Sequence, residues 1–110
     1  MNRLPWSVRG SDYNEHTASV GEMVCAFAAE NKLATVIGTL TAGRLLGGKG
    51  FRVGHGYLVV LPAAAFFSWQ GKSFEGQGVS PDVLVEWSPE AVLEGRDNQL
   101  EKAIELVRSL

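Results

Sequence analysis

The sequence predicts an α/β or α+β chain in which a small mixed sheet packs against helices. Three observations support this fold class. A helical apolar period begins after Ser19, a β-branched apolar segment follows at residues 33–38, and residues 98–110 form an amphipathic pattern. Helix-like and strand-like segments therefore alternate along a chain of 110 residues, a length that suits one domain with one core.

The first residues of the chain show no sustained period of either kind. Pro5, Gly10 and Asp12 interrupt this stretch, and each of them favours a turn or a loop. We therefore expect residues 1–12 to form an irregular N-terminal segment and residues 13–110 to form the domain.

A helix is predicted to begin directly after Ser19 and to end near Asn31 and Lys32. Apolar residues recur at the i, i+3, i+4 and i+7 spacing of an amphipathic helix; they are Val20, Met23, Val24 and Phe27. The run VCAFAAEN, with three alanines, is rich in residues that favour helix formation.

The middle of the chain alternates between apolar and glycine-rich stretches. Residues 33–38, LATVIG, are short, apolar and β-branched, as in a buried strand. Residues 39–50 form a glycine-rich loop, and residues 51–69 then predict two or three strands with glycine breaks. Residues 70–82 form a second glycine-rich loop.

The C-terminal part returns to strand and helix. Residues 83–87, VLVEW, predict a last strand, and residues 88–97 a short turn or helix. Residues 98–110 form an amphipathic helix, for which Asp97 or Asn98 can supply the N-cap. Its apolar face consists of Leu100, Ala103, Ile104 and Val107.

Composition excludes several classes of function. The formal net charge is −2 with acidic and basic residues interspersed, so we expect neither a nucleic-acid partner nor an anionic membrane surface as partner. The longest apolar run is eleven residues and contains a proline, well short of a bilayer span. The N-terminus has no apolar core of a signal peptide, so the compartment is left open, with the cytoplasm as default.

Ser19 allows two interpretations. With Glu22 three residues further on, it fits the capping box of a helix N-terminus. The same position suits a nucleophile, because a helix N-terminus offers free N–H groups and the positive end of the dipole. The amides of Val20 and Gly21 would then stabilise an oxyanion beside the serine. Both interpretations place Ser19 at the same point, so the sequence leaves both open.

Other candidate sites are weaker. Residues 43–50 nearly match the phosphate-binding G-x-x-x-x-G-K-[ST] loop, but Gly50 replaces the Ser or Thr and a strand-like pattern follows where a helix is needed. His16, Cys25 and His55 lack the spacing of zinc ligands. We interpret Cys25 as a core residue and His55 as a strand or turn residue, and we expect no metal and no cofactor.

A carboxylate lies in the second glycine-rich loop. Residues 75–82, EGQGVSPD, favour a turn in which Pro81 fixes the backbone and Asp82 bonds locally. Considered together with Ser19, Glu75 is a candidate for the carboxylate that orients the histidine of a Ser–His–acid arrangement.

Four segments in succession resemble a known family: TASVGEMVCAFAAENKLATVIGTLTAG, GYLVVLP, FEGQGVSPDVLVE and GRDNQLEKAIELV. Over roughly residues 13–110 they resemble the C-terminal, nucleophile-bearing part of the tail-specific (C-terminal processing) serine peptidases, a family that includes the tricorn protease core. The resemblance implies that Ser19 is the nucleophile, that the fold is a partial crotonase/ClpP-like core, and that the substrate is a peptide or protein.

The family uses two kinds of catalytic base. In one branch a lysine follows the serine in a glycine turn, but Arg44 stands at that place here, and arginine cannot be deprotonated. Lys49 lies further along and would fit only with a loop insertion. The sequence is therefore similar to the tricorn-like branch, which uses a histidine and a glutamate. The resemblance matches the glutamate to Glu75 and implies a histidine from well upstream of Ser19.

Two hypotheses of different classes follow. The first is a truncated serine endopeptidase domain in which Ser19 attacks a peptide carbonyl and Glu75 orients a histidine, either His16, His55 or one from a missing N-terminal half. A serine without a base is not activated, so we expect very low activity from this chain alone.

The second hypothesis is a non-catalytic oligomeric or binding module derived from a peptidase fragment. The residues before Ser19 do not have the pattern of the apolar strand that leads into this motif in the family, so a sheet edge would lie unpaired. Such an edge favours pairing with another chain, and we therefore expect a homo-oligomer.

Overall fold

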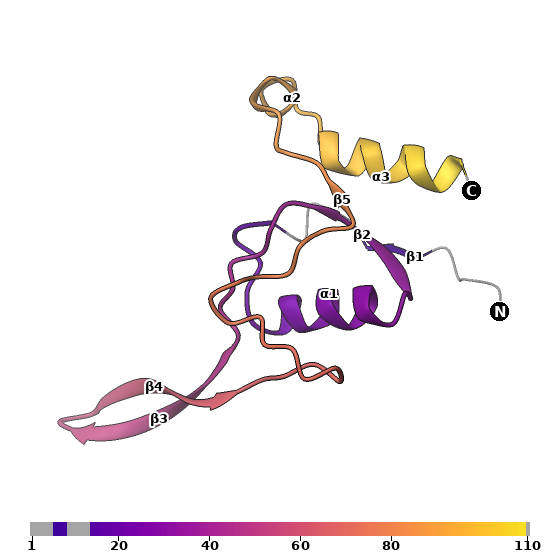
Figure 1. Ribbon diagram of the computed structural model, residues 1–110. Coiled ribbons are helices and arrows are strands. Elements are labelled where there is room, and N and C mark those ends of the chain that lie inside the picture. Colours follow the sequence, from indigo (N-terminus) through magenta and orange to yellow (C-terminus); the bar gives the residue numbers. More distant parts are fainter. Residues whose placement is uncertain (1–5, 9–13, 110) are drawn as a thin grey trace.

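The computed structural model describes residues 6–8 and 14–109 (Figure 1). It contains both helices and strands, as the predicted fold class requires. In chain order they are β1 (Trp6–Val8), α1 (Val20–Glu30), β2 (Ala34–Gly38), β3 (Leu46–Gly54), β4 (Tyr57–Ala65), β5 (Val83–Leu84), α2 (Pro89–Leu93) and α3 (Asn98–Arg108). None of the helices in the described residues combines the length and the hydrophobicity of a membrane-crossing helix.

Three of the strands form a parallel sheet in the order β1-β2-β5. The central strand β2 is the predicted LATVIG strand, and its last three residues, from Val36 to Gly38, are buried. The antiparallel pair β3–β4 forms a separate sheet. The prediction of one small mixed sheet was therefore wrong, because the parallel and antiparallel pairings do not share a strand.

The N-terminal segment is not wholly irregular. Strand β1 lies within the residues that we expected to lack structure, and it pairs in parallel with β2, with Trp6 opposite Ala34 and Val8 opposite Val36. Three residues are too few to show a period, so tertiary pairing alone defines this strand. It covers one edge of β2, whereas we had expected a sheet edge to lie unpaired.

Helix α1 spans the predicted residues but buries a different face. Its buried side chains are Glu22, Cys25, Ala26 and Ala28, and this face packs toward β2. The predicted apolar stripe faces outward instead, with Val20 67% exposed and Phe27 50% exposed. Small residues allow the helix to approach the sheet closely, and the large apolar side chains are left on the surface of this chain.

A small core lies between α1 and the two glycine-rich loops. It consists of Cys25, Ala26, Leu45, Phe74 and Val79, each at most 5% exposed. The prediction that Cys25 is a core residue is confirmed. Because both loops contribute to this core, they are ordered parts of the fold rather than flexible connections.

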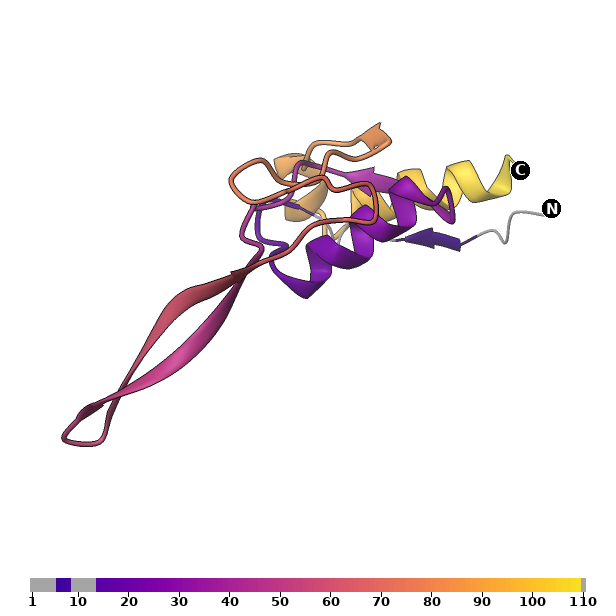
Figure 2. The ribbon, with the colours of Figure 1, turned by 60° about the horizontal axis from the view of Figure 1, so that its bottom comes forward.

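Strands β3 and β4 form a two-stranded ribbon, here called the arm (residues 46–65), that projects from the rest of the molecule (Figures 1 and 2). It begins at Leu46, inside the stretch predicted as a loop. His55 lies in its tip turn with a φ of 49°, which confirms the prediction of a strand or turn residue. The arm gives the chain a radius of gyration of 17.0 Å, against about 13 Å for a compact domain of this length.

The C-terminal elements agree with the predicted pattern in outline. Helix α2 confirms the short helix, and α3 begins after Asp97, whose side chain accepts a hydrogen bond from the Leu100 N–H at 2.9 Å. The last strand is shorter than predicted. In α3, Ala103 and the amide Gln99 are buried, whereas Ile104 is 41% exposed.

Asp82 joins β5 to β2 rather than bonding locally as predicted. Its carboxylate accepts a hydrogen bond from the Val36 N–H at 2.8 Å, and its own N–H donates to the Val36 carbonyl at 2.8 Å. The contact spans 46 residues of sequence. A local turn pattern could not indicate a partner so distant in the chain.

Replacing Asp82 by alanine is expected to lower the free energy of unfolding by about 1–3 kcal/mol, because the buried Val36 N–H would lose its charged acceptor. Urea denaturation measures the change. Glu86→Ala serves as the control, since Glu86 is exposed and has no side-chain hydrogen bond among the described residues. Equal stability of the two variants would contradict the role of Asp82 in joining the strands.

Candidate active site

Ser19 occupies a strained turn at the start of α1. It is the N-cap residue, with φ 56° and ψ −122°. A residue other than glycine rarely adopts a positive φ, and such strain costs about 1–3 kcal/mol and is concentrated at functional sites. Ser19 is also exposed. The prediction that Ser19 begins the helix is confirmed. The surrounding structure must hold Ser19 in this unfavourable backbone conformation.

Glu22 is what holds this turn. Its carboxylate is fully buried and accepts hydrogen bonds from four donors on two segments. They are the N–H groups of Ser19 at 3.1 Å, Gly43 at 2.6 Å and Arg44 at 2.9 Å, together with the Thr41 hydroxyl. Glu22 therefore clamps the first turn of α1 to the first glycine-rich loop.

Sequence analysis assigned Glu22 only to a capping box and missed this larger role. A signal was present in the sequence. Glu22 lies three residues before Cys25 and four before Ala26, on the small-residue face of the helix that turns out to be buried. A charged residue on such a face needs several hydrogen-bond partners.

Residues 43–45 connect Ser19 to Glu75. The Ser19 N–H donates to the Arg44 carbonyl at 2.9 Å, and the next residue, Leu45, donates its N–H to the Glu75 carboxylate. The Gly76 N–H also donates to the Gly43 carbonyl at 2.8 Å. The two candidate residues, 56 positions apart in the sequence, are thus fixed to opposite sides of one short segment.

The two glycine-rich loops interlock through their backbones. The Thr41 N–H donates to the Val79 carbonyl at 3.2 Å, and the Val79 N–H donates to the Thr41 hydroxyl at 2.8 Å. At Gly43 and Gly78, both with positive φ, an added Cβ would lie within 3.0 Å of the opposite backbone. These glycines serve close packing between loops, and strand β3 follows directly, where a phosphate-binding loop would need a helix.

The two candidate oxyanion amides differ in their partners. The Gly21 N–H donates to the Ala18 carbonyl at 3.2 Å. The Val20 N–H has no acceptor within the part of the chain that the structure describes, and it points from the positive end of the α1 dipole. Gly21 also leaves little space, since an added Cβ would lie 2.8 Å from the Thr17 side chain.

The two histidines lie apart from this arrangement. His16 has a side chain 84% exposed, and its Nε2 lies 3.6 Å from the Glu15 carboxylate. A backbone hydrogen bond, together with the Thr39 hydroxyl and the His16 charge, lowers the pKa of Glu15. His55 lies at the tip of the arm. Over residues 14–109, neither histidine forms a hydrogen bond with Ser19 or Glu75, and no three His, Cys, Asp or Glu side chains gather as a metal site would require.

A strained, exposed serine at a helix N-terminus, with an amide available beside it in a chain of mixed helices and strands, is typical of the nucleophile segment of a serine hydrolase. Comparison with known proteins makes this specific. Residues 13–85 match peptidase family S41, and the chain belongs to that family.

The relatives are tricorn proteases and their homologues. The chain is 38% identical over 96 residues to the tricorn protease of Thermoplasma volcanium, covering 86% of this chain and 9% of the relative. It is 35% identical over 95 residues to a putative tricorn-like protease C-terminal subunit of Sulfurisphaera tokodaii, covering 84% of this chain and 11% of that protein.

A solved structure supports the same relationship. The crystal structure of the tricorn protease superimposes with a TM-score of 0.77 at 31% identity, over 86% of this chain and 10% of that one. The chain therefore spans about a tenth of the length of the relatives that it matches. The resemblance to a tricorn-like peptidase fragment is confirmed.

Proposed function

We propose that this chain is the nucleophile-bearing part of a tricorn-like serine endopeptidase, without the catalytic lysine of the other branch of the family. The observation that carries the proposal is the backbone of Ser19, which is held at a positive φ by the buried Glu22 and exposed to solvent. Membership of peptidase family S41 supports the reaction class. The substrate class is a peptide or protein.

The proposed chemistry assigns one task to each residue. The Ser19 hydroxyl attacks the peptide carbonyl, and the Val20 N–H stabilises the negative charge that develops on the carbonyl oxygen. Gly21 contributes by its small size. A histidine takes the serine proton and passes it to the leaving amine, and Glu75 orients that histidine.

In this proposal neither histidine of the chain acts as the general base that takes the proton from Ser19. His16 is the histidine nearest to Ser19 in sequence, but its exposed side chain pairs with Glu15. We therefore propose that a histidine from another part of the peptidase completes the site. Ser19 is then positioned but not activated, and hydrolysis by this chain alone is expected to be very slow.

Labelling with a fluorophosphonate probe, followed by intact mass measurement, tests the proposal. We expect slow formation of one adduct, faster in the presence of imidazole, which can replace a missing histidine base. The adduct should be absent in Ser19→Ala and unchanged in Ser80→Ala, a control at an exposed loop serine. Loss of labelling in a folded His16→Ala variant would assign the base to His16 instead.

A second candidate function is a non-catalytic oligomeric or binding module derived from such a peptidase. The observation that favours it is the exposed apolar stripe of α1, which needs a partner surface. Folded protein that forms no adduct, with or without imidazole, would support this function over catalysis.

A further inference from the structure

The apolar side chains of the arm are largely exposed to solvent. Apart from Gly47, every residue of β3 and β4 is exposed, and Leu58 and Val60 are 60% and 63% exposed. A two-stranded ribbon alone is marginally stable in water. The arm therefore needs a surface on which to pack.

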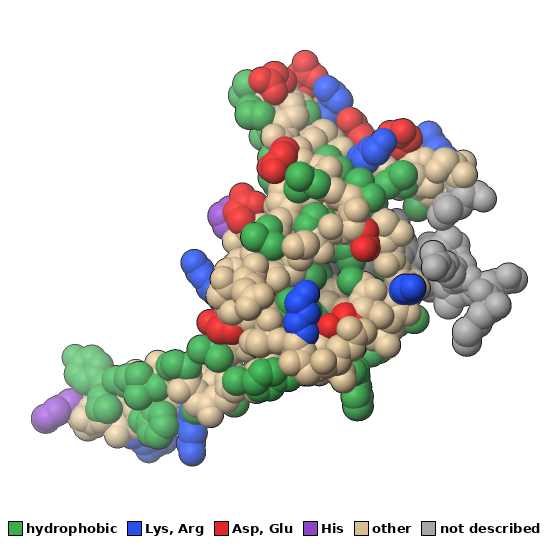
Figure 3. Space-filling view, viewed as in Figure 1, with side chains coloured by type: hydrophobic (Ala, Val, Ile, Leu, Met, Phe, Trp, Pro, Cys, Tyr) green, Lys and Arg blue, Asp and Glu red, His purple; other side chains and the backbone are tan. Residues whose placement is uncertain are grey.

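The arm also differs from the rest of the chain in charge. It contains Lys49 and Arg52 but no acidic residue, so its formal charge is +2 and that of the remaining residues is −4. Figure 3 shows hydrophobic and basic side chains along the arm, and acidic side chains over the body of the molecule. This asymmetry favours an interaction between the arm and a body like that of this chain.

The two faces of the arm are not equivalent. Lys49 pairs with Leu61 and Phe51 with Val59, so these four side chains share one face. The Lys49 Nζ lies 5.7 Å from the centre of the Phe51 ring. Arg52 pairs with Leu58 on the opposite face. The first face thus presents three apolar side chains and one ammonium group.

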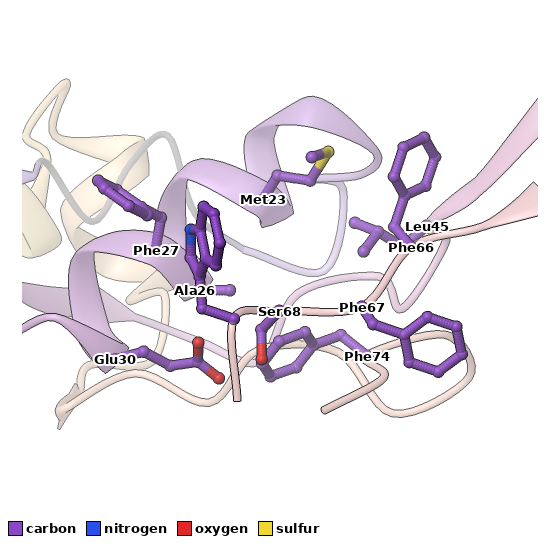
Figure 4. Close-up of a pocket in the computed structure, with 10 residues that line it drawn as sticks. Met23, Ala26, Phe27, Glu30, Leu45, Phe66, Phe67, Ser68 and Phe74 are labelled. Carbon is purple, nitrogen blue, oxygen red and sulfur yellow. The ribbon is translucent and has the colours of Figure 1, made fainter. Parts of the chain in front are cut away.

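A complementary groove lies along α1. It has a volume of about 300 Å³, and Trp69 is among the residues that line it. Met23, Phe27 and Phe66 form other parts of its apolar walls (Figure 4). Glu30 is the only charged residue that lines it. The Glu30 Oε1 atom is buried and has no hydrogen-bond partner within residues 14–109. The groove therefore offers apolar contact and one carboxylate group, that of Glu30, which has no ion-pair partner among the described residues.

We propose that the arm of a second copy of this chain packs on this groove, with Phe51, Val59 and Leu61 over the apolar walls and Lys49 paired with Glu30. In a two-fold dimer the arm of each chain packs on the groove of the other chain, so the dimer contains two such contacts. The exposed area is sufficient. The chain exposes 7946 Å², against about 5,900 Å² for a compact monomer, and a standard interface covers about 800 Å² per partner.

Charge reversal tests this contact by sedimentation equilibrium of the whole chain at micromolar concentrations. The wild type is expected at twice the monomer mass of 11.9 kDa. Lys49→Glu and Glu30→Lys are each expected to weaken the dimer at least about 30-fold. Mixing the two variants should restore it, because every contact then joins opposite charges. Arg52→Glu, on the opposite face of the arm, is the control and should dimerise like the wild type.

A monomeric wild type would overturn the proposal and leave the groove for a different chain. A dimer that neither reversal weakens would also overturn it. If a single variant fails to fold, as judged by circular dichroism, a second measurement applies. Glu30→Cys and Lys49→Cys chains, mixed under mild oxidation, should form a disulfide-linked heterodimer, and its absence would contradict the contact.

Discussion

Replacing Glu22 by alanine is expected to lower the free energy of unfolding by about 3–5 kcal/mol, a large fraction of the stability of a small domain. Four donors lose their acceptor together: three backbone N–H groups and the Thr41 hydroxyl. The variant also leaves a cavity beside the buried Cys25 and Ala26.

Glutamine at position 22 should be little better than alanine. Its side-chain NH₂ group is a donor, and it would face the N–H groups of Gly43 or Arg44, which are donors as well. Chemical denaturation measures the loss of stability, and the exposed Glu86→Ala variant again serves as the control. A stable Glu22→Gln protein would show that the carboxylate charge does not hold the turn.

The same substitutions should affect Ser19. Without Glu22, nothing on the α1 side holds the Ser19 N–H, and the residue should relax from its positive φ. We therefore expect fluorophosphonate labelling of Ser19 to fall in any Glu22 variant that remains folded. Unchanged labelling in such a variant would mean that Glu22 stabilises the fold without positioning the serine.

Replacing Gly78 by alanine is expected to destabilise the chain by about 3–5 kcal/mol, among the larger effects of single substitutions. The added Cβ would lie too close to the Thr41 carbonyl oxygen, and a backbone atom cannot move aside as a side chain can. The positive φ of 72° adds a conformational cost.

Gly76 provides a matched control in the same loop. It has nearly the same φ, 71°, but an added Cβ would meet nothing within 4 Å. Gly76→Ala should therefore cost only about 1–2 kcal/mol, the conformational part of the effect. The difference between the two variants in denaturation experiments isolates the clash between the loops. Equal losses would show that the loops do not pack as closely as the structure indicates.

Local sequence patterns determined the helices of this protein. Helix α1 begins after Ser19 and α3 after Asp97 as predicted, because caps and helical periods depend on neighbours within a few residues. The strand β2 and the turn at His55 followed from β-branched residues and flanking glycines in the same way. The position of Ser19 at the start of a helix could likewise be predicted from its neighbours in the sequence.

The tertiary structure alone decided the contacts that make the site. Glu22 meets Gly43 and Arg44 across about twenty residues, and Asp82 meets Val36 across 46. Strand β1 exists only because β2 pairs with it. The helix α1 turns its small residues inward although its large apolar residues form the stronger period. Pairings between distant segments depend on the geometry of the whole chain, and no local pattern encodes which partner a buried carboxylate or a strand edge will find.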